Sequence, residues 1–374
     1  MPRPDIPTER QALLILNALP EIGPVTLRRL MDAFGHEARK ILAASPAELK
    51  RVRGVGDAMA AALRGWRNHV SLEKEEARLA ETGARFVTAG DPAYPELLKE
   101  IHDPPIGLYW NGDDLPRGPH IAIVGTRRPT LYGQATARKL ARGLARRGCC
   151  VVSGLARGID TAAHEGALEG GGRTAAVLGC GLDIIYPAEN LDLFRRIASQ
   201  GAVLSEFPFG RRADRQSFPM RNRIVAGMCS GLIVVESGVR GGSLITAGFA
   251  GDQGRTVFAV PGRIDQAASQ GCHQLIRDGA VLVQDVDDVL EELQYLPGLQ
   301  PPQPGREKST ASPIPELSPG EAAVMALLAE GAILSPDEIG SQTDLAGPEL
   351  GATLMMLELK RLIAKRVDGA FEAR

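Results

Sequence analysis

The feature that most constrains the fold is a regular alternation of short apolar runs with helix-length segments between residues 121 and 283. The runs are continuous stretches rich in Val, Ile and Ala, which is typical of strands buried on both faces. Parallel strands need long crossover connections, and the intervening segments are long enough to supply them as helices. The pattern predicts an α/β fold with an extended, Rossmann-like parallel-sheet core. The predicted strands are 121–125, 150–154, 175–179, 203–205, 232–235, 257–260 and 281–283.

Other segments precede this core, which we place at residues 120–296. Residues 1–85 predict a small helical domain, in which Thr8 caps the first helix. Within it, residues 52–56 (Val-Arg-Gly-Val-Gly) resemble the hairpin of helix-hairpin-helix DNA-binding modules. Two glycines permit a tight turn and leave backbone N–H groups free for a phosphate. A SAM-like domain with a purely structural role is the alternative. Residues 86–119 predict a Pro-rich connector that leads into the core.

The segments that follow the core predict a second small domain. Residues 297–319 contain seven prolines, which indicates a flexible linker. Residues 320–374 show three helical patterns and then a hairpin with an Asp-Gly turn, which is the plan of a winged helix. Its third helix carries Glu349 and Glu358 and no basic residue before Lys360. Because DNA reading needs basic and amide side chains, we favour a protein-contact or structural role for this domain.

Composition excludes several classes of protein. No apolar run reaches the ~18 residues of a membrane span, and the first ten residues show no secretory-signal pattern. The five cysteines form no Cys-x-x-Cys pair, so we expect reduced thiols in a cytoplasmic protein, with no metal and no cofactor. The formal net charge is −2, but residues 120–230 hold sixteen Lys or Arg against eight Asp or Glu. That basic stretch favours a local phosphate-binding surface.

The candidate binding site lies in the loops that follow the predicted strands. Ligands of open α/β sheets bind beyond the carboxyl ends of the strands. The segments expected there are rich in Gly, Ser and Arg. Glycine lets backbone N–H groups approach an anion, and arginine adds bidentate contacts to phosphate. The loops therefore predict a site for a nucleotide or for an extended polyanion along one edge of the sheet. They are 125–128, 153–160, 179–181, 205–208, 236–243 and 261–263.

Two enzyme motifs are absent from these loops. Gly125 is followed by Thr-Arg-Arg where a dinucleotide-binding fingerprint needs further glycines at fixed spacing. Residues 238–243 approach the glycine spacing of a P-loop but lack its lysine. Asp160 and His164 lie four residues apart on one predicted helix and are able to meet. We favour a structural hydrogen bond there over catalysis.

A different enzyme hypothesis stays open. Glu206 and Glu236 each follow a predicted strand and form a candidate acid/base pair. The Ser- and Gly-rich loops would then cradle the phosphate of a nucleotide or nucleoside monophosphate. In the competing and favoured interpretation, these carboxylates pair with nearby arginines.

Five arginines occur within thirteen residues, at positions 211, 212, 215, 221 and 223. Phe218 opens a predicted helix just before Arg221, Asn222 and Arg223. A helix start with arginines, an amide and an aromatic ring is suited to hold a phosphate and to contact a base. Alternatively, Arg221 and Arg223 pair with the two glutamates to fix the sheet edge. Both roles are compatible if one arginine points inward and the other outward.

Taken together, the motifs resemble those of the DprA/Smf family of DNA-processing proteins. As a set they are highly specific, and they span about residues 95–290. The N-terminal helical part and the predicted winged helix also agree with longer members of the family. The motifs are Val124-Gly-Thr-Arg127, Ser153-Gly-Leu-Ala-Arg-Gly-Ile-Asp160 with His164, Ala176-Val-Leu-Gly-Cys-Gly-Leu-Asp183 with Tyr186-Pro187, Ser205-Glu-Phe-Pro208, Phe218-Pro-Met-Arg-Asn-Arg-Ile224, Gly242-Ser-Leu-Ile-Thr-Ala247 and Phe258-Ala-Val-Pro-Gly262.

The resemblance implies a Rossmann-like domain that binds single-stranded DNA without cutting it. It further implies a homodimer that protects incoming strands in natural transformation and loads the RecA recombinase onto them. Two departures from the family pattern are mild. Thr126 stands where a serine is common, and Gly241 stands where many members have serine, which removes a hydroxyl but keeps the backbone N–H.

We therefore expect a recombination mediator with no catalytic residues and no metal ligands. Phosphates are expected at Arg127 and Arg240, and bases at Phe218 and Asn222. Loop donors are expected from residues 154, 157, 242 and 243. The full set of expected DNA-binding residues is Arg127, Gly154, Arg157, Phe218, Arg221, Asn222, Arg223, Arg240, Gly242 and Ser243.

The sequence leaves alternative functions and several contact surfaces open. The runner-up is the nucleotide-processing enzyme described above, and a third hypothesis makes the chain chiefly an adaptor whose terminal domains bind proteins. The residues do not identify the RecA-contacting or dimer surfaces. They also leave open whether the N-terminal domain contacts duplex DNA, what the winged helix binds, and which arginines face DNA rather than an internal partner.

Overall fold

A computed structural model describes residues 7–20, 22–116, 118–294, 317–366 and 368–373 of the chain. These residues form two compact units. The first contains the N-terminal helices and the α/β core, and the second is built chiefly from the described residues after position 316. The predicted linker at 297–319 lies outside the described residues up to position 316.

The N-terminal region is helical, as its sequence pattern predicts. Except for α3, each of these helices begins at a capping Ser or Thr, a proline or a glycine. Thr8 caps the first helix with a capping box, in which its hydroxyl accepts a hydrogen bond from the N–H of Gln11. The helices are α1 (Glu9–Ala18), α2 (Pro24–Ala33), α3 (Ala38–Ala43), α4 (Pro46–Leu49), α5 (Asp57–Arg64) and α6 (Leu72–Thr82). Leu16, Leu30, Ile41 and Leu63 are among the buried side chains of their common core.

The core sheet has nine strands in the order β1-β2-β6-β5-β4-β3-β7-β8-β9. Strands β3 to β9 pair in parallel with one another, which confirms the parallel sheet predicted from the sequence. They are β3 (His120–Val124), β4 (Cys150–Ser153), β5 (Thr174–Leu178), β6 (Ala202–Ser205), β7 (Gly231–Val234), β8 (Thr256–Ala259) and β9 (Val281–Leu282).

The segment predicted as a connector contains two further strands. β1 (Arg85–Thr88) pairs antiparallel with β2 (Gly107–Gly112), and β2 pairs antiparallel with β6 at one end of the parallel series. The short helix α7 (Glu96–Lys99) lies between them. The sequence did not predict these strands, because prolines are frequent in this segment. Tyr109 and Trp110 of β2 are nevertheless fully buried. The segment therefore extends the sheet rather than only leading into it.

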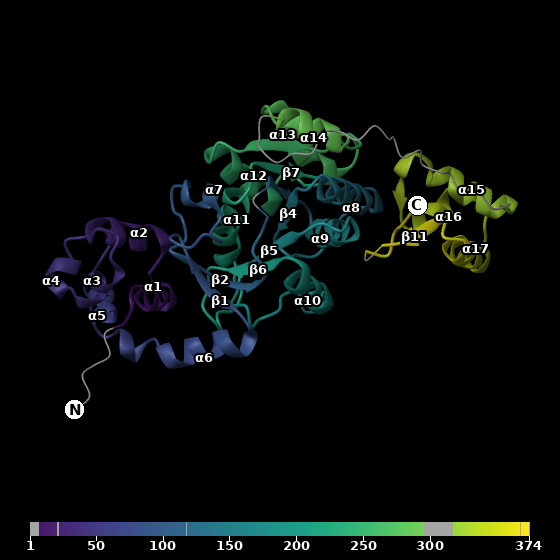
Figure 1. Cartoon of the computed structure of the whole chain (residues 1–374). Helices are drawn as coiled ribbons and strands as arrows, with labels where there is room; N and C mark the ends of the chain where they lie inside the picture. Colours follow the sequence, from purple (N-terminus) through teal and green to yellow (C-terminus); the bar gives the residue numbers. More distant parts are fainter. Residues whose placement is uncertain (1–6, 21, 117, 295–316, 367, 374) are drawn as a thin grey trace. The chain divides into compact units, whose positions relative to one another are not determined.

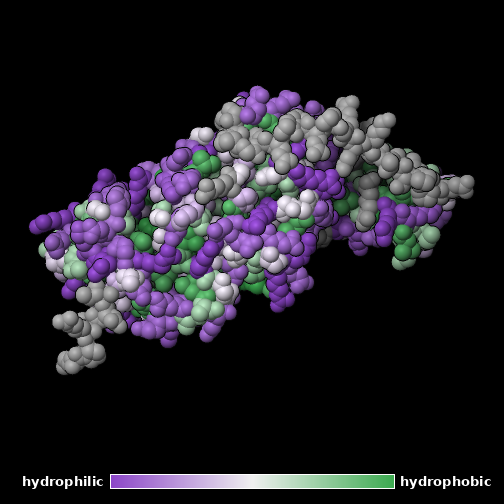
Figure 2. All heavy atoms as spheres, viewed as in Figure 1, coloured by the Kyte–Doolittle hydropathy of each residue, from purple (hydrophilic) through white to green (hydrophobic). Residues whose placement is uncertain are grey.

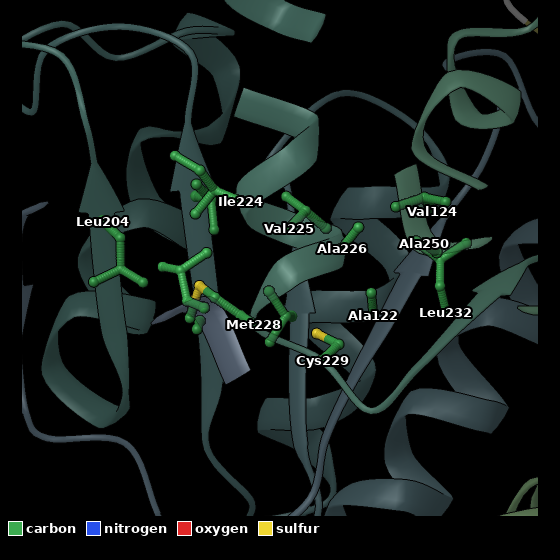
Figure 3. Close-up of a cluster of buried hydrophobic side chains, with 14 of the residues drawn as sticks. Ala122, Val124, Leu204, Ile224, Val225, Ala226, Met228, Cys229, Leu232 and Ala250 are labelled. Carbon is green, nitrogen blue, oxygen red and sulfur yellow. The ribbon is translucent and has the colours of Figure 1, made fainter. Parts of the chain in front are cut away.

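Helices cover both faces of the sheet (Figure 1). Alternate side chains of each strand face opposite sides: in β3, Ala122 and Val124 belong to one buried cluster, and Ile121 and Ile123 belong to another. Figure 3 shows part of the first cluster, where Ile224 and neighbouring residues of a helix pack on the strands. The covering helices are α8 (Leu131–Arg146), α9 (Ile159–Glu169), α10 (Leu191–Gln200), α11 (Ser217–Gly227), α12 (Gly242–Asp252), α13 (Gln270–Arg277) and α14 (Val286–Glu292).

The second unit has the helices and the hairpin predicted for a winged helix, together with one more short strand. Its elements are α15 (Pro319–Leu327), β10 (Ile333–Leu334), α16 (Pro336–Ser341), α17 (Gly347–Leu359), β11 (Ile363–Lys365) and β12 (Phe371–Ala373). The three strands form an antiparallel sheet in the order β10-β12-β11. Val324, Leu354 and Ile363 belong to its small core.

One buried histidine makes the α/β core sensitive to acid. His164 of α9 is fully buried, and its Nδ1 lies 2.7 Å from the hydroxyl oxygen of Thr174. Burial lowers the pKa of this imidazole from its usual 6.5 to about 3. The folded protein therefore holds His164 neutral at pH values where an unfolded chain protonates it.

We predict that replacing His164 with Asn reduces the loss of stability on acidification. Between pH 6.5 and pH 3, His164 is protonated in the unfolded state but neutral in the folded state. The free energy of unfolding therefore falls as the pH drops toward 3. From pH 7 to pH 4.5, the wild type should lose about 1–3 kcal/mol more than His164→Asn. Urea unfolding followed by circular dichroism at several pH values measures this difference. Parallel pH profiles for the two proteins would contradict the assignment.

Candidate nucleic-acid interface

The order of the strands creates a cleft at the carboxyl edge of the sheet. After β3 the chain builds β4, β5 and β6 on one side, and then returns to place β7 on the other side of β3. The loops after β3 and β7 therefore lead in opposite directions, which is where open α/β sheets bind ligands. A cleft of about 560 Å³ lies there. Its lining includes Gly125, Thr126, Arg127, Arg128, Gly154, Asp160, Arg215, Phe218, Arg221, Asn222, Ser237, Gly241, Gly242, Ser243, Ile245 and Thr246.

The loops after β3 and β4 pack closely against each other at the base of the cleft. The carboxylate of Asp160, in the first turn of α9, accepts hydrogen bonds from the N–H groups of Gly154 and Ala156 at 3.1 and 3.2 Å. Between them, Leu155 adopts a left-handed φ of 56°, which is rare for a branched apolar residue. A Cβ on Gly158 would lie 2.5 Å from the carbonyl oxygen of Thr126. Only glycine therefore allows the loops after β3 and β4 to approach this closely.

A buried guanidinium group joins the loop after β4 to strand β5. Arg221 of α11 donates hydrogen bonds to the carbonyl oxygens of Gly154 and Val177. Its Nε donates to the amide oxygen of Asn222 at 3.1 Å. Burial lowers the pKa of Arg221, and the charge of Asp160 opposes that shift. Burial likewise raises the pKa of Asp160, against the charge of Arg221 and the two loop N–H groups. The two groups stabilise each other's charged forms inside the protein.

An arginine and two aromatic rings line the accessible side of the site. The guanidinium carbon of Arg127 lies 4.8 Å from the ring centroid of Phe218, in a cation–π contact. The ring of the exposed residue Tyr186 lies 5.9 Å from the ring of Phe218. These three residues and Arg157 line a small pocket beside the cleft. The guanidinium of Arg157 pairs with Glu189. Flat rings beside a guanidinium group offer stacking surfaces for a base next to a contact for a phosphate.

The start of α12 contributes backbone donors. Gly241 is its N-cap and makes no side-chain capping bond, so the first N–H groups of the helix face the cleft without a side-chain acceptor. Ser243 donates its hydroxyl to the Ser237 hydroxyl at 2.8 Å. A Cβ on Gly241 would lie 2.2 Å from that Ser237 oxygen. A side chain at position 241 would therefore clash with Ser237 where it lies in this chain.

Positive charge surrounds the opening. Arg127, Arg128, Arg215 and Arg240 have exposed side chains, and among the described residues no carboxylate forms an ion pair with any of them. Arg211, in contrast, pairs with Asp214 at 2.5 Å. Hydrophilic residues also predominate on the face of the first unit drawn in Figure 2. The cleft therefore combines unpaired cations with helix-start donors, which suits a polyanion.

The structure brings together most of the expected site residues but corrects the roles of three. Arg223 does not line the cleft: it is 2% exposed and pairs with Glu206 and Asp103. The N–H of Gly154 is not a ligand donor, because Asp160 already accepts it. Arg221 lines the cleft, yet its guanidinium is occupied by loop carbonyls.

Two other expectations concern exposed loops and possible catalytic groups. Arg240 is exposed just before α12 but is absent from the described lining of the cleft. Glu206 is engaged with Arg223, and Glu236 is buried outside the same lining. Asp160 and His164 do not pair, since Asp160 holds the β4 loop and His164 contacts Thr174. The ion pair of Glu206 with Arg223 agrees with the structural alternative raised by the sequence. The expected hydrogen bond between Asp160 and His164 is wrong, because each side chain has a different partner.

Sequence reasoning missed several residues that line the site. Tyr186 and Asp160 stood inside family motifs but received no role in binding, and Arg128 was noted only as part of a loop. Arg215 was counted in the arginine cluster without being separated from its neighbours. The signal that could have identified them was their closeness in sequence to residues already assigned to the site.

The expected hairpin in the N-terminal domain places Gly54 and Gly56 on the surface, next to a helix start (α5) that has no side-chain cap.

The fold and cleft define an α/β protein with an arginine-bordered cleft at the carboxyl edge of its sheet, and comparisons with known proteins identify its family. A family model described as "DNA recombination-mediator protein A" matches residues 85–294, and one described as "DprA winged helix domain" matches residues 308–369. These matches and the relatives below show that the chain belongs to the DprA/Smf family. No helix among the described residues is long and apolar enough to cross a membrane.

Relatives cover most of the chain. Protein Smf from Synechocystis is 35% identical over 94% of this chain and 96% of its own length. DNA processing protein DprA from Streptococcus pneumoniae is 44% identical over 59% of this chain and 79% of its own length. The X-ray structure of the S. pneumoniae protein is similar with a TM-score of 0.67 and 35% identity, covering 76% of this chain and 98% of that one.

A second solved structure concerns DNA processing protein A from Helicobacter pylori. It has a TM-score of 0.51 and 32% identity, and covers 56% of this chain and 96% of that one. That relative is described as having a "unique single-stranded DNA binding mode".

We predict that Gly154→Ala destabilises the core. A Cβ at this position would lie 2.1 Å from Nη1 of Arg221, so either the guanidinium or the β4 loop must move. The expected cost is about 1–3 kcal/mol, measured by urea unfolding. Gly248→Ala is the matched control, because that helical glycine has nothing within 4 Å of a new Cβ. The control should gain about 0.5–1 kcal/mol, and an equal loss in both variants would contradict the packing role of Gly154.

Proposed function

We propose that this chain is a recombination mediator that binds single-stranded DNA in the cleft between the β3 and β7 loops. The observation that carries the proposal is the contact of Arg127 with Phe218 at the edge of a cleft bordered by unpaired arginines. An inorganic phosphate needs only anion donors, whereas a DNA strand also has bases that stack on aromatic faces. Family membership and the single-stranded DNA binding described for the H. pylori relative support the same ligand.

The residues divide the work between backbone and bases. Arg127 and Arg240 contact phosphates, together with Arg128 and Arg215, which line the cleft. The N–H groups at the start of α12 hold a further phosphate at Gly242 and Ser243. Phe218 and Tyr186 offer their rings to bases, and Asn222 contributes amide hydrogen bonds. Arg221 and Asp160 are buried beneath these residues, where they hold the loop after β4 in place.

We also propose the activities that the family resemblance implies for the whole protein. The chain forms homodimers, protects incoming strands during natural transformation and loads RecA recombinase onto them. The terminal domains then supply further contacts. α17 of the winged-helix unit exposes Met355, Met356 and Leu359 and carries Glu349 and Glu358, a composition better suited to protein than to DNA.

The enzyme hypothesis gains no support from the geometry. Catalysis on a nucleotide would need an acid or base within reach of the ligand. Glu206 and Glu236 are absent from the cleft lining among the residues that the structure describes. Asp160 does line the cleft, but its carboxylate already accepts two backbone hydrogen bonds. We therefore propose binding without turnover.

A salt series tests the phosphate contacts. The logarithm of the binding constant for an oligothymidylate should fall linearly with the logarithm of salt concentration, and each lost phosphate contact should flatten the slope by about 0.7. We expect Arg127→Ala with Arg240→Ala to flatten the slope by about 1.4 and to weaken binding. Arg196→Ala is the control, because this exposed arginine lies within α10, whereas Arg240 immediately precedes Gly241 and Gly242 of the cleft lining. Fluorescence anisotropy reports the binding, and identical slopes in all variants would place the strand elsewhere.

A filament assay tests the mediator activity. Oligonucleotides covered by a single-strand-binding protein resist RecA, so RecA-driven strand exchange on them requires a loading factor. We expect the wild-type chain to restore strand exchange and the Arg127/Arg240 double variant to restore it several-fold less well, because loading requires the DNA contact. Restoration by the double variant at wild-type levels would separate RecA loading from this cleft.

A further inference from the structure

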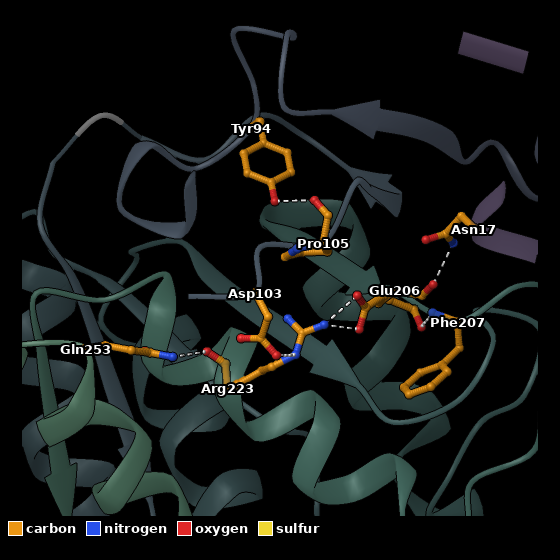
Figure 4. Close-up of polar contacts among 9 residues, drawn as sticks. Asn17, Tyr94, Asp103, Pro105, Glu206, Phe207, Arg223 and Gln253 are labelled. Atoms are coloured by element: carbon orange, nitrogen blue, oxygen red, sulfur yellow. Dashed lines mark hydrogen bonds and ion pairs between the residues drawn. The ribbon is translucent and has the colours of Figure 1, made fainter. Parts of the chain in front are cut away.

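The cleft helix α11 has a second polar contact on the side away from the cleft. Arg223, two residues after Arg221, points into the protein and is 2% exposed. Its Nη2 lies 2.5 and 2.7 Å from the carboxylate oxygens of Glu206, and its Nε lies 3.2 Å from a carboxylate oxygen of Asp103 (Figure 4). One guanidinium group therefore joins α11 to the end of β6 and to the segment before β2.

Further hydrogen bonds fix each partner of this cluster. Tyr94 donates its hydroxyl to the carbonyl oxygen of Pro105 at 2.6 Å, which holds the turn that carries Asp103. Gln253, which follows α12, donates to the carbonyl oxygen of Arg223 at 3.2 Å. Both helices that border the cleft, α11 and α12, thus meet at Arg223.

The cluster also reaches the N-terminal helical domain. The side-chain amide of Asn17, near the end of α1, donates to the carbonyl oxygen of Glu206 at 2.7 Å (Figure 4). Glu206 therefore accepts Arg223 with its carboxylate and Asn17 with its backbone. A continuous set of contacts runs from α1 through Glu206 and Arg223 to the helix that carries Phe218 and Asn222.

The energetics make this cluster sensitive to a change in any member. Burial raises the pKa of Glu206, and the charge of Arg223 opposes that shift. Removing one partner of a buried ion pair leaves the other charge without compensation inside the protein, so the surrounding backbone must move or admit water. Because α11 is tied to the cluster at Arg223, such a movement displaces the start of the helix.

We propose that Arg223 is a positioning residue for DNA binding. It holds α11 against the end of β6 and thereby couples the N-terminal helical domain to the cleft. The inference rests on the function proposed above and adds a role for a residue that the sequence analysis placed in direct contact with DNA. Arg223 touches no nucleotide. It sets the positions of Phe218 and Asn222, which do.

The test compares the affinity and the salt slope of full-length variants for a fluorescein-labelled oligothymidylate. Arg223→Met should weaken binding about tenfold, yet leave the slope at the wild-type value, because no phosphate contact is lost. Arg127→Ala, a contact residue, should instead flatten the slope by about 0.7. Hydrogen exchange should be faster at residues 217–222 of α11 in Arg223→Met than in the wild type.

Two further variants keep the test decisive. Asp103→Asn alters the more exposed partner of Arg223. Asn17→Ala removes the link from α1 to Glu206, together with a contact to Tyr109, and leaves the ion pairs of Arg223 in place. Each should weaken binding about threefold with an unchanged slope, even if Arg223→Met fails to fold. Thr174→Val is the control for lost stability: it removes a buried hydroxyl that donates to the Val151 carbonyl oxygen at 2.6 Å, at the other end of the strands. This control should lower the melting temperature and leave the affinity within twofold of the wild type.

The outcomes separate the two proposals. Wild-type affinity in Arg223→Met and Asp103→Asn overturns the positioning role, and a flattened slope in Arg223→Met makes Arg223 a direct phosphate contact. Unchanged affinity in Asn17→Ala alone overturns the coupling to the N-terminal domain. Failure of the wild-type chain to bind the oligothymidylate overturns the proposed function itself.

Discussion

The architecture depends on the parallel pairing of strands β3 to β9. Parallel neighbours cannot be joined by hairpins, so each strand is followed by a crossover that returns the chain along one face. All the strands then end at the same edge, and helices begin there with their unpaired N–H groups. Because β3 lies between β4 and β7, the loops at this edge lead away in opposite directions and leave the cleft between them. The site follows from the topology before any of its side chains is considered.

Within that frame, α11 divides its polar residues among three environments. Phe218 and Asn222 border the cleft. Arg221 bonds backbone carbonyls of the loop after β4 and of strand β5, and Arg223 pairs with Glu206 on the side away from the cleft. A charged residue is costly to bury without partners. Arg221 bonds two backbone carbonyls, and Arg223 forms ion pairs with Glu206 and Asp103. The arginine-rich sequence of this helix is therefore mostly structural, and the cations that remain available for a polyanion come from the loops around it.

The sequence predicted the parallel sheet, because seven apolar runs of strand length leave few alternatives. It missed β1 and β2, since their proline-rich surroundings resemble a connector and the burial of Trp110 depends on contacts far along the chain. For the site, glycines and arginines after the strands located the cleft. Spacing places Arg221 and Arg223 about 200° apart around α11, but it does not tell which of the two sides meets the cleft. The roles of Gly154 and Asp160 likewise became clear only from their mutual hydrogen bond.

The central claim is that a single DNA strand lies in the cleft between the β3 and β7 loops, with its bases against Phe218 and Tyr186. Photocrosslinking an oligonucleotide that carries 5-iodouracil, followed by mass spectrometry of the peptides, tests this most directly. The account predicts crosslinks at Phe218 or Tyr186, and their loss when unlabelled single strands compete in excess. Crosslinks confined to the N-terminal helices or to the winged-helix unit would contradict it.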